Sequence, residues 1–129
     1  MSQNTATVFL VDDDASVRKA LKRLIHAAGY GVETFEDAAA FLEGYAAPRA
    51  RACLVLDIRM PGMSGLELQQ ALNGTGRALP IVFITGHGDE DARSQALAFG
   101  AVDVLHKPLD ERVLLEAIER ALRRGGWPQ

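Results

Sequence analysis

The stretch VFLVDDDASVRKAL, residues 8–21, decides the fold. It begins as an apolar strand and runs directly into three adjacent aspartates, Asp12, Asp13 and Asp14. After them the pattern changes to that of a helix, for which Asp14 is a suitable N-terminal cap. The apolar residues of that helix fall on one face: Val17, Leu21, Leu24, Ile25 and Ala28. The stretch therefore predicts a buried strand, an acidic loop and an amphipathic helix.

The same alternation of strand and helix is repeated five times along the chain. The predicted strands are Thr7–Val11, Val32–Phe35, Cys53–Leu56, Pro80–Thr85 and Val102–Leu105. The helices are expected to begin at Asp14, Asp37, Ser64, Asp89 and Asp110. Cys53–Leu56 is apolar throughout, as expected of a central parallel strand buried on both faces. The pattern predicts an α/β fold with a parallel sheet between two layers of helices, and periodicity alone leaves the order of the strands open.

Composition narrows the class of protein. The chain has 129 residues, 48% of them hydrophobic and 24% charged, which is typical of a single globular domain. A net charge of −3 provides no basic surface for direct binding to nucleic acid. No apolar run is long enough to cross a membrane, and the single cysteine, Cys53, cannot form an internal disulfide. We therefore expect a cytoplasmic protein without a membrane partner.

Polar side chains follow four of the predicted strands. Asp12 and Asp13 follow the first strand, Asp57 the third, Thr85 ends the fourth, and Lys107 follows the fifth. In open α/β sheets, ligands bind beyond the carboxyl ends of the strands. Three carboxylates held together there need a compensating cation, and Mg²⁺ prefers such oxygen ligands together with phosphate oxygens. The sequence predicts a magnesium site, with Mn²⁺ as the alternative ion.

The same residues suggest a reaction. Asp57, at the end of the most buried strand, could serve as a nucleophile toward a phosphoryl group. Thr85 and Lys107 would then hold the equatorial phosphoryl oxygens. Asp14 is interpreted as the helix cap rather than as a metal ligand, because the periodic helix begins directly after it.

Through these residues the chain resembles the receiver domain of two-component response regulators. Its motifs resemble those of the subgroup related to FixJ. Four segments carry the resemblance, in order: VDDD, LVLDIRMPGMSGLEL, PIVFITGHGD and GAVDVLHKP. It implies a flavodoxin-like (βα)5 three-layer sandwich with strand order 2-1-3-4-5. It also implies a receiver domain over residues 1–124, with residues 125–129 as a tail or the start of a linker. The implied partner is a sensor histidine kinase, and the implied output is transcription.

The resemblance assigns roles to individual residues. It implies that Asp57 is phosphorylated and that Thr85 and Lys107 sense or clamp the phosphoryl group. The implied metal ligands are Asp12, Asp13, Asp57 and the backbone carbonyl of Arg59. It further implies a cis peptide between Lys107 and Pro108, and a domain that signals rather than a separate enzyme.

One departure from the family pattern concerns the signal route. Val104 stands where the family usually has Tyr or Phe as a rotamer switch, and Leu109 stands where Phe is common. We therefore expect the signal to travel by loop and helix shifts, through the face formed by the fourth helix, fifth strand and fifth helix, where effectors or a second copy would bind. His87, near Thr85, is a further candidate modulator, through access of water to the site.

Two alternatives use the same residues differently. A small Mg²⁺-dependent phosphohydrolase of the haloacid-dehalogenase type would use Asp12 as its nucleophile, with Asp14 completing its Asp-x-Asp motif. Against it, the chain has neither an acidic pair at the end of a later strand after Lys107 nor a cap-domain insertion to enclose a substrate. The other alternative is a pseudo-receiver that only binds partners, against which the complete set of site residues argues.

Overall fold

The sheet is formed by parallel strands. The computed structural model describes residues 6–45, 51–76, 78–86 and 90–124. Within these residues the strands are β1 Thr7–Val11, β2 Gly31–Phe35, β3 Ala52–Asp57, β4 Ile81–Thr85 and β5 Asp103–His106. They form one sheet in the order β2-β1-β3-β4-β5, and each neighbouring pair is parallel. This confirms the flavodoxin-like order, which the periodicity of the sequence had left open.

Four of the described helices begin directly after the caps that the sequence predicts. In the described part of the chain they are α1 Ala15–Ala27, α2 Ala38–Gly44, α3 Gly65–Gly74, α4 Glu90–Ala98 and α5 Glu111–Arg124. Asp14 caps α1 by accepting hydrogen bonds from the Ser16 and Val17 amides, and Ser64 caps α3 in a capping box with Glu67. The expected cap of α4, Asp89, lies outside the described residues.

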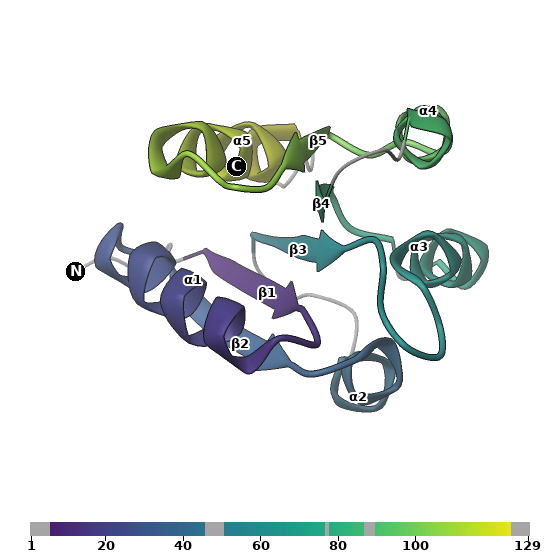
Figure 1. The fold of residues 1–129 in the computed structure, drawn as a ribbon, viewed down its shortest axis with the longest axis horizontal. Coiled ribbons are helices and arrows are strands. Elements are labelled where there is room, and N and C mark those ends of the chain that lie inside the picture. Colours follow the sequence, from purple (N-terminus) through teal and green to yellow (C-terminus); the bar gives the residue numbers. More distant parts are fainter. Residues whose placement is uncertain (1–5, 46–50, 77, 87–89, 125–129) are drawn as a thin grey trace.

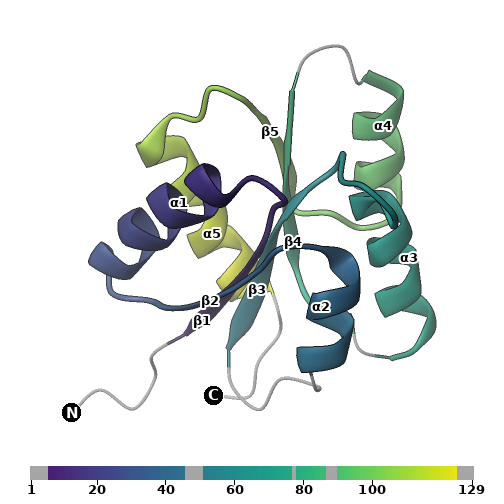
Figure 2. The same cartoon turned by 60° about the horizontal axis from the view of Figure 1, so that its bottom comes forward.

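The helices cover the two faces of the sheet unequally. Helices α1 and α5 lie on one face, and α2, α3 and α4 lie on the other (Figures 1 and 2). Strand β3, in the middle of the sheet, is buried at every residue. Each face of the sheet packs against its helices through a separate apolar cluster, represented by Phe41 and Leu68 on one side and by Ile25 and Ile118 on the other. None of the described helices has the length and apolar character needed to cross a bilayer.

Strand boundaries differ slightly from those predicted. Strand β3 continues through Asp57, because this residue still pairs with Ile84 of β4. Strand β5 begins at Asp103 and includes His106, which pairs with Thr85. The apolar run therefore marks the buried part of each strand, while the ladder of backbone hydrogen bonds extends into the polar residues that follow.

The pairing register places the polar ends of the strands together. Val11 at the end of β1 pairs with Leu56 of β3, so the next residues along each strand, Asp12 and Asp57, are neighbours across the sheet. Because all strands run in one direction, every carboxyl end reaches the same edge of the sheet. The fold therefore creates one polar site from segments far apart in sequence.

Candidate functional site

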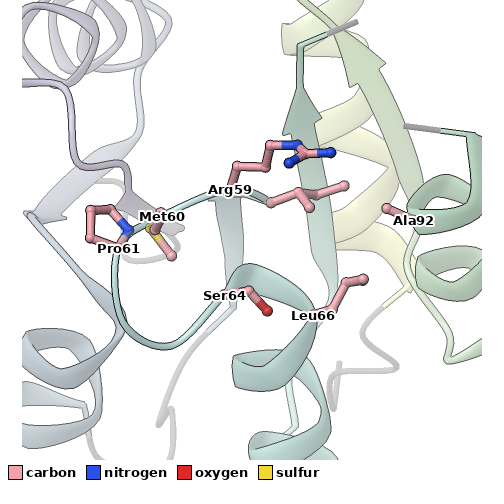
Figure 3. Close-up of a pocket in the computed structure, with 7 residues that line it drawn as sticks. Arg59, Met60, Pro61, Ser64, Leu66 and Ala92 are labelled. Atoms are coloured by element: carbon pink, nitrogen blue, oxygen red, sulfur yellow. The ribbon is translucent and has the colours of Figure 1, made fainter. Parts of the chain in front are cut away.

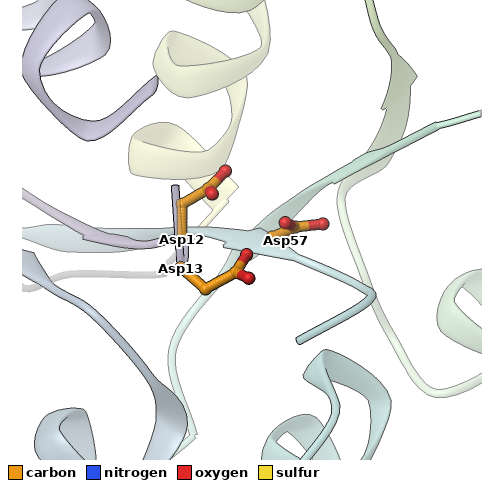
Figure 4. Close-up of side chains that lie close together, drawn as sticks. All are labelled: Asp12, Asp13 and Asp57. Carbon is orange, nitrogen blue, oxygen red and sulfur yellow. The ribbon is translucent and has the colours of Figure 1, made fainter. Parts of the chain in front are cut away.

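Three carboxylates meet at the carboxyl edge of the sheet. Asp12 and Asp13 follow β1, Asp57 ends β3, and one carboxylate oxygen from each lies within 4.8 Å of the others. Figure 4 shows the three side chains side by side. The predicted acidic cluster is therefore present, and Asp14 is separate from it as the cap of α1.

Backbone hydrogen bonds hold two of these carboxylates. Oδ1 of Asp12 accepts a hydrogen bond from the Asp14 amide at 2.8 Å, and Oδ1 of Asp57 accepts one from the Arg59 amide at 3.3 Å. Asp12 is fully buried and Asp57 is only 6% exposed. Oδ2 of Asp12 is also buried, yet it accepts no hydrogen bond from the described residues. A buried carboxylate oxygen without a donor is unfavourable unless a cation approaches it.

Burial changes the acidity of both buried carboxyl groups. Loss of hydration raises the pKa of Asp57 to about 6, and the neighbouring charge of Asp12 acts in the same direction. The Lys107 ammonium and the Arg59 amide oppose this increase. Burial also raises the pKa of Asp12, against the hydrogen bond from Asp14 and the charge of Lys107. In the absence of a metal ion, the site therefore favours protonation more than an exposed aspartate would.

Lys107 supplies the positive charge of the site. Its Nζ atom lies 3.8 Å from Oδ2 of Asp12 and 3.8 Å from Oδ2 of Asp57. Its backbone amide donates to the carbonyl oxygen of Thr85 at 2.8 Å, and the Lys107–Pro108 peptide bond is cis. Thr85 itself is fully buried at the end of β4. The structure thus brings the three carboxylates together, with the Lys107 ammonium facing two of them, and connects Thr85 to Lys107 through the main chain.

This donor set suits a hard divalent cation. Three carboxylates within 4.8 Å of one another offer only oxygen ligands, and the buried Asp12 Oδ2 has no hydrogen-bond donor among the residues that the structure describes. Mg²⁺ and similar ions prefer such ligands, whereas Zn²⁺ sites are usually built from His and Cys. A bound cation would also oppose the loss of hydration and the mutual repulsion of the carboxylates, which together raise the two pKa values.

A pocket opens beside the acidic cluster. It has a volume of about 530 Å³ and begins at Ile58 and Arg59, immediately after Asp57, and extends to Ala92 at the start of α4. Figure 3 shows the Arg59 side chain extending toward the Ala92 side of this pocket, with Ser64 below it. The loop after Asp57 therefore presents both a charged and an apolar surface next to the carboxylate.

Of the two candidate modulators, Val104 and His87, only Val104 lies within the described residues. Val104 is 3% exposed and belongs to the apolar cluster on the α4 side of the sheet, together with Phe83 and Ala96. His87 lies outside the described residues. At the aromatic position of the family, this chain therefore has a small buried side chain.

Two residues that shape the site were not predicted from the sequence. The guanidinium of Arg18 on α1 donates to the main-chain oxygen of Asp12 at 2.7 Å. Gly65 at the start of α3 lies so close to the end of β3 that a Cβ atom would overlap the main-chain oxygen of Asp57. A basic residue one turn into the helix after an acidic loop, and a glycine directly after a helix cap, are the signals that could have indicated them.

Comparison with known proteins identifies the class that this fold and site define. The family model of the response regulator receiver domain matches residues 8–119. The chain belongs to this family, and the hydrolase alternative is set aside.

The similar proteins include regulators from several bacteria. Response regulator protein TodT of Pseudomonas putida is 43% identical over 123 residues, covering 95% of this chain and 54% of that protein. Transcriptional regulatory protein TdiR of Thauera aromatica is 45% identical over 119 residues, covering 92% and 52%. The chain therefore spans about half the length of these curated relatives.

Solved structures of response regulators share the fold. The response regulator StyR matches with a TM-score of 0.87 and 50% identity, over 94% of this chain and 61% of that chain. The crystal structure of FixJ-N matches with a TM-score of 0.83 and 42% identity, over 95% and 96% of the two chains. This similarity agrees with the resemblance of the sequence motifs to the FixJ subgroup.

Proposed function

We propose that this receiver domain accepts a phosphoryl group on Asp57 from a sensor histidine kinase, in a reaction that requires Mg²⁺. The observation that carries the proposal is the convergence of Lys107 and the acidic cluster on Asp57. The Lys107 Nζ atom is 3.8 Å from Asp57, and Asp57 shares its site with the carboxylates of Asp12 and Asp13. A carboxylate between a fixed cation and a candidate metal site is suited to attack an anionic phosphoryl group.

The proposed reaction transfers one phosphoryl group from a histidine of the kinase to Asp57. An Asp57 carboxylate oxygen attacks phosphorus, a P–O bond forms, and the P–N bond to the donor histidine breaks. The released imidazole takes up a proton from solvent. The pKa of Asp57, about 6 in the metal-free site, leaves this carboxylate largely ionised at neutral pH. The nucleophile is therefore available without a separate general base.

The remaining residues hold charge in place. Asp12, Asp13, Asp57 and the backbone carbonyl of Arg59 would hold Mg²⁺, with Mn²⁺ as a substitute. When bound, the ion neutralises charge on the carboxylates and on the phosphoryl oxygens. Lys107 keeps its ammonium beside Asp57, and the Thr85 hydroxyl at the end of β4 is suited to a phosphoryl oxygen. Both side chains would respond to the new charge on Asp57.

The proposed output is a change in binding on the α4–β5–α5 face, defined here as the exposed surface of those three elements. Thr85 ends β4 just before α4, and Lys107 connects β5 to α5, so a movement of either side chain acts on these elements. An effector or a second copy would bind there and control transcription, in the cytoplasm. Because Val104 is not aromatic, we expect the signal to travel by loop and helix shifts.

Intact-mass spectrometry tests the proposal. The protein is incubated with a small acyl phosphate and Mg²⁺, in the presence and absence of a chelator. We expect one added phosphoryl group in the wild type, which is lost in Asp57→Asn and with chelator. If Asp57→Asn is still labelled and Asp12→Asn is not, Asp12 is the nucleophile. If no variant and no wild-type sample is labelled, the domain is a binding module only.

A further inference from the structure

Arg18 contacts the acidic loop from the helix that follows it. Its Nη1 atom donates a hydrogen bond to the main-chain oxygen of Asp12 at 2.7 Å. The Arg18 side chain is half-buried, while its neighbour Lys19 is exposed. A charged guanidinium bound to a backbone carbonyl makes a short and strong hydrogen bond. This contact fixes the chain at a residue whose carboxylate is fully buried in the site.

The contact closes the loop between β1 and α1 on itself. Asp14 caps α1, and the Arg18 amide donates to the Asp14 carbonyl at 3.0 Å in the first turn. The Asp14 amide donates to Oδ1 of Asp12 at 2.8 Å. The Arg18 guanidinium then returns to the Asp12 carbonyl, so three hydrogen bonds connect Asp12, Asp14 and Arg18 in a ring. These hydrogen bonds fix the end of β1 relative to the start of α1.

Such a ring is needed because the loop carries two of the three carboxylates. Asp12 and Asp13 repel each other and Asp57, with oxygens from all three within 4.8 Å. Without support, the loop would relax by moving the carboxylates apart. The cation would then have to gather them again, at a cost in binding free energy.

We propose that Arg18 is a positioning residue for the cation site. Its guanidinium holds the Asp12 main chain so that the carboxylates of Asp12 and Asp13 face Asp57 before the ion arrives. This role rests on the proposed binding of Mg²⁺ by the acidic cluster. The Arg18 guanidinium is bonded to the backbone of a candidate ligand residue, so Arg18 would act through that backbone and not as a ligand itself.

The charge of Arg18 and its geometry predict effects of opposite sign. A positive charge near a cation site repels the incoming ion, so its removal by itself tightens binding. A positioning contact favours the bound arrangement of ligands, so its removal weakens binding. Lys19 on the same helix carries the same charge on an exposed side chain and provides a matched control.

The experiment compares Arg18→Met with Lys19→Met. Methionine keeps an unbranched stem in the half-buried position and removes the donor and the charge. The dissociation constant for Mn²⁺ is measured by the paramagnetic resonance of the free ion. Hydrogen exchange at the Asp14 amide and thermal unfolding are followed in the metal-free protein.

We expect Arg18→Met to weaken Mn²⁺ binding about tenfold, the lower end of the effect known for residues that orient metal ligands. The Asp14 amide should exchange faster in this variant, while Lys19→Met should bind Mn²⁺ as the wild type does or slightly more tightly. Equal dissociation constants in the two variants, or tighter binding by Arg18→Met, would overturn the role of Arg18 and leave the proposed function standing. A wild-type protein that binds no Mn²⁺ would overturn the metal site and the role of Arg18 together. Unfolding of metal-free Arg18→Met at the temperature of the assay would show a structural role instead.

Discussion

The Nζ atom of Lys107 lies 3.8 Å from Oδ2 of Asp57, although β5, which Lys107 follows, and β3, which ends at Asp57, are not neighbours in the sheet. The same ammonium lies 3.8 Å from Oδ2 of Asp12, so one cation faces two buried carboxylates. Burial, together with the charge of Asp12, raises the pKa of Asp57 to about 6, and the single positive charge of Lys107 opposes this only in part. The metal-free site is therefore short of positive charge, and the first two predictions below follow from that.

The stability of the metal-free protein should depend on pH through Asp57. The pKa of this carboxyl is raised from 3.8 to about 6, so the folded state holds its proton more tightly than the unfolded chain does. Raising the pH from about 4 to 6 then favours unfolding, and the loss is complete above about pH 6. Asp57→Asn lacks this ionisation. It should be more stable than the wild type at neutral pH, by the order of 1–3 kcal/mol, with a difference that vanishes below about pH 4.

Urea unfolding at a series of pH values, with chelator present, measures this difference. Comparison of the two proteins at each pH cancels the titration of groups that do not interact with Asp57. A difference in the free energy of unfolding that stays constant from pH 4 to 7 would contradict a raised pKa at Asp57.

Neutralising Asp13 should separate metal binding from folding. Asp13 is exposed and contributes a carboxylate to the acidic cluster. Asp13→Asn removes a repelling charge, so the metal-free protein should unfold at the same temperature or slightly higher. Mg²⁺ at a hundredfold excess over its dissociation constant should stabilise the wild type by about 2.7 kcal/mol and the variant much less. Calorimetry with and without Mg²⁺ provides the measurement, and a large loss of stability without metal would mean that Asp13 is structural.

A methyl group at Gly65 should disturb the end of β3, where Asp57 lies. A Cβ atom there would overlap the main-chain oxygen of Asp57 and would lie 3.0 Å from Cα of Ile58. Both are backbone atoms, which cannot move aside cheaply, so Gly65→Ala should destabilise the fold by about 1–3 kcal/mol. It should also slow labelling of Asp57 by an acyl phosphate, because the carboxylate moves with its main chain.

Gly74 at the other end of α3 offers the matched control for this substitution. A Cβ atom at Gly74 would meet nothing within 4 Å. Gly74→Ala should therefore leave labelling unchanged and stabilise the helix slightly, by at most about 0.5–1 kcal/mol. Equal effects of the two substitutions on unfolding and on labelling would contradict the close approach of α3 to Asp57.

Removing the Thr85 hydroxyl should weaken the response to phosphorylation. Thr85 is fully buried at the end of β4, directly before the loop that leads to α4. If its hydroxyl binds a phosphoryl oxygen in the active state only, its loss costs about 1.5 kcal/mol, which lowers the ratio of active to inactive state about tenfold. Thr85→Ala should lose most of the response, and Thr85→Ser should keep it.

Hydrogen exchange across α4, β5 and α5, measured with and without a bound acyl-phosphate analogue, reports that response. The oligomeric state of the same samples shows whether the α4–β5–α5 face binds a second copy. A wild-type response in Thr85→Ala, or protection that changes only around α1 and α2, would contradict the proposed route.

The elements of this fold could be predicted from local patterns. Apolar runs and caps such as Asp14 and Ser64 indicated where strands end and helices begin, because capping and burial depend on residues close in the chain. The candidate site was also predictable in outline. Asp57 and Lys107 each occur at the end of a predicted strand, and in a parallel sheet all such ends lie at one edge.

What the sequence by itself determined is therefore the set of elements and the residues at their ends. Only the tertiary structure decided that β1 lies beside β3, so that Asp12 and Asp57 are adjacent, and that one ammonium faces both. It alone also revealed the return of Arg18 to the acidic loop. The physical reason is that strand order, burial and the reach of long side chains depend on contacts between distant segments. The raised pKa values in turn depend on how much water those contacts exclude.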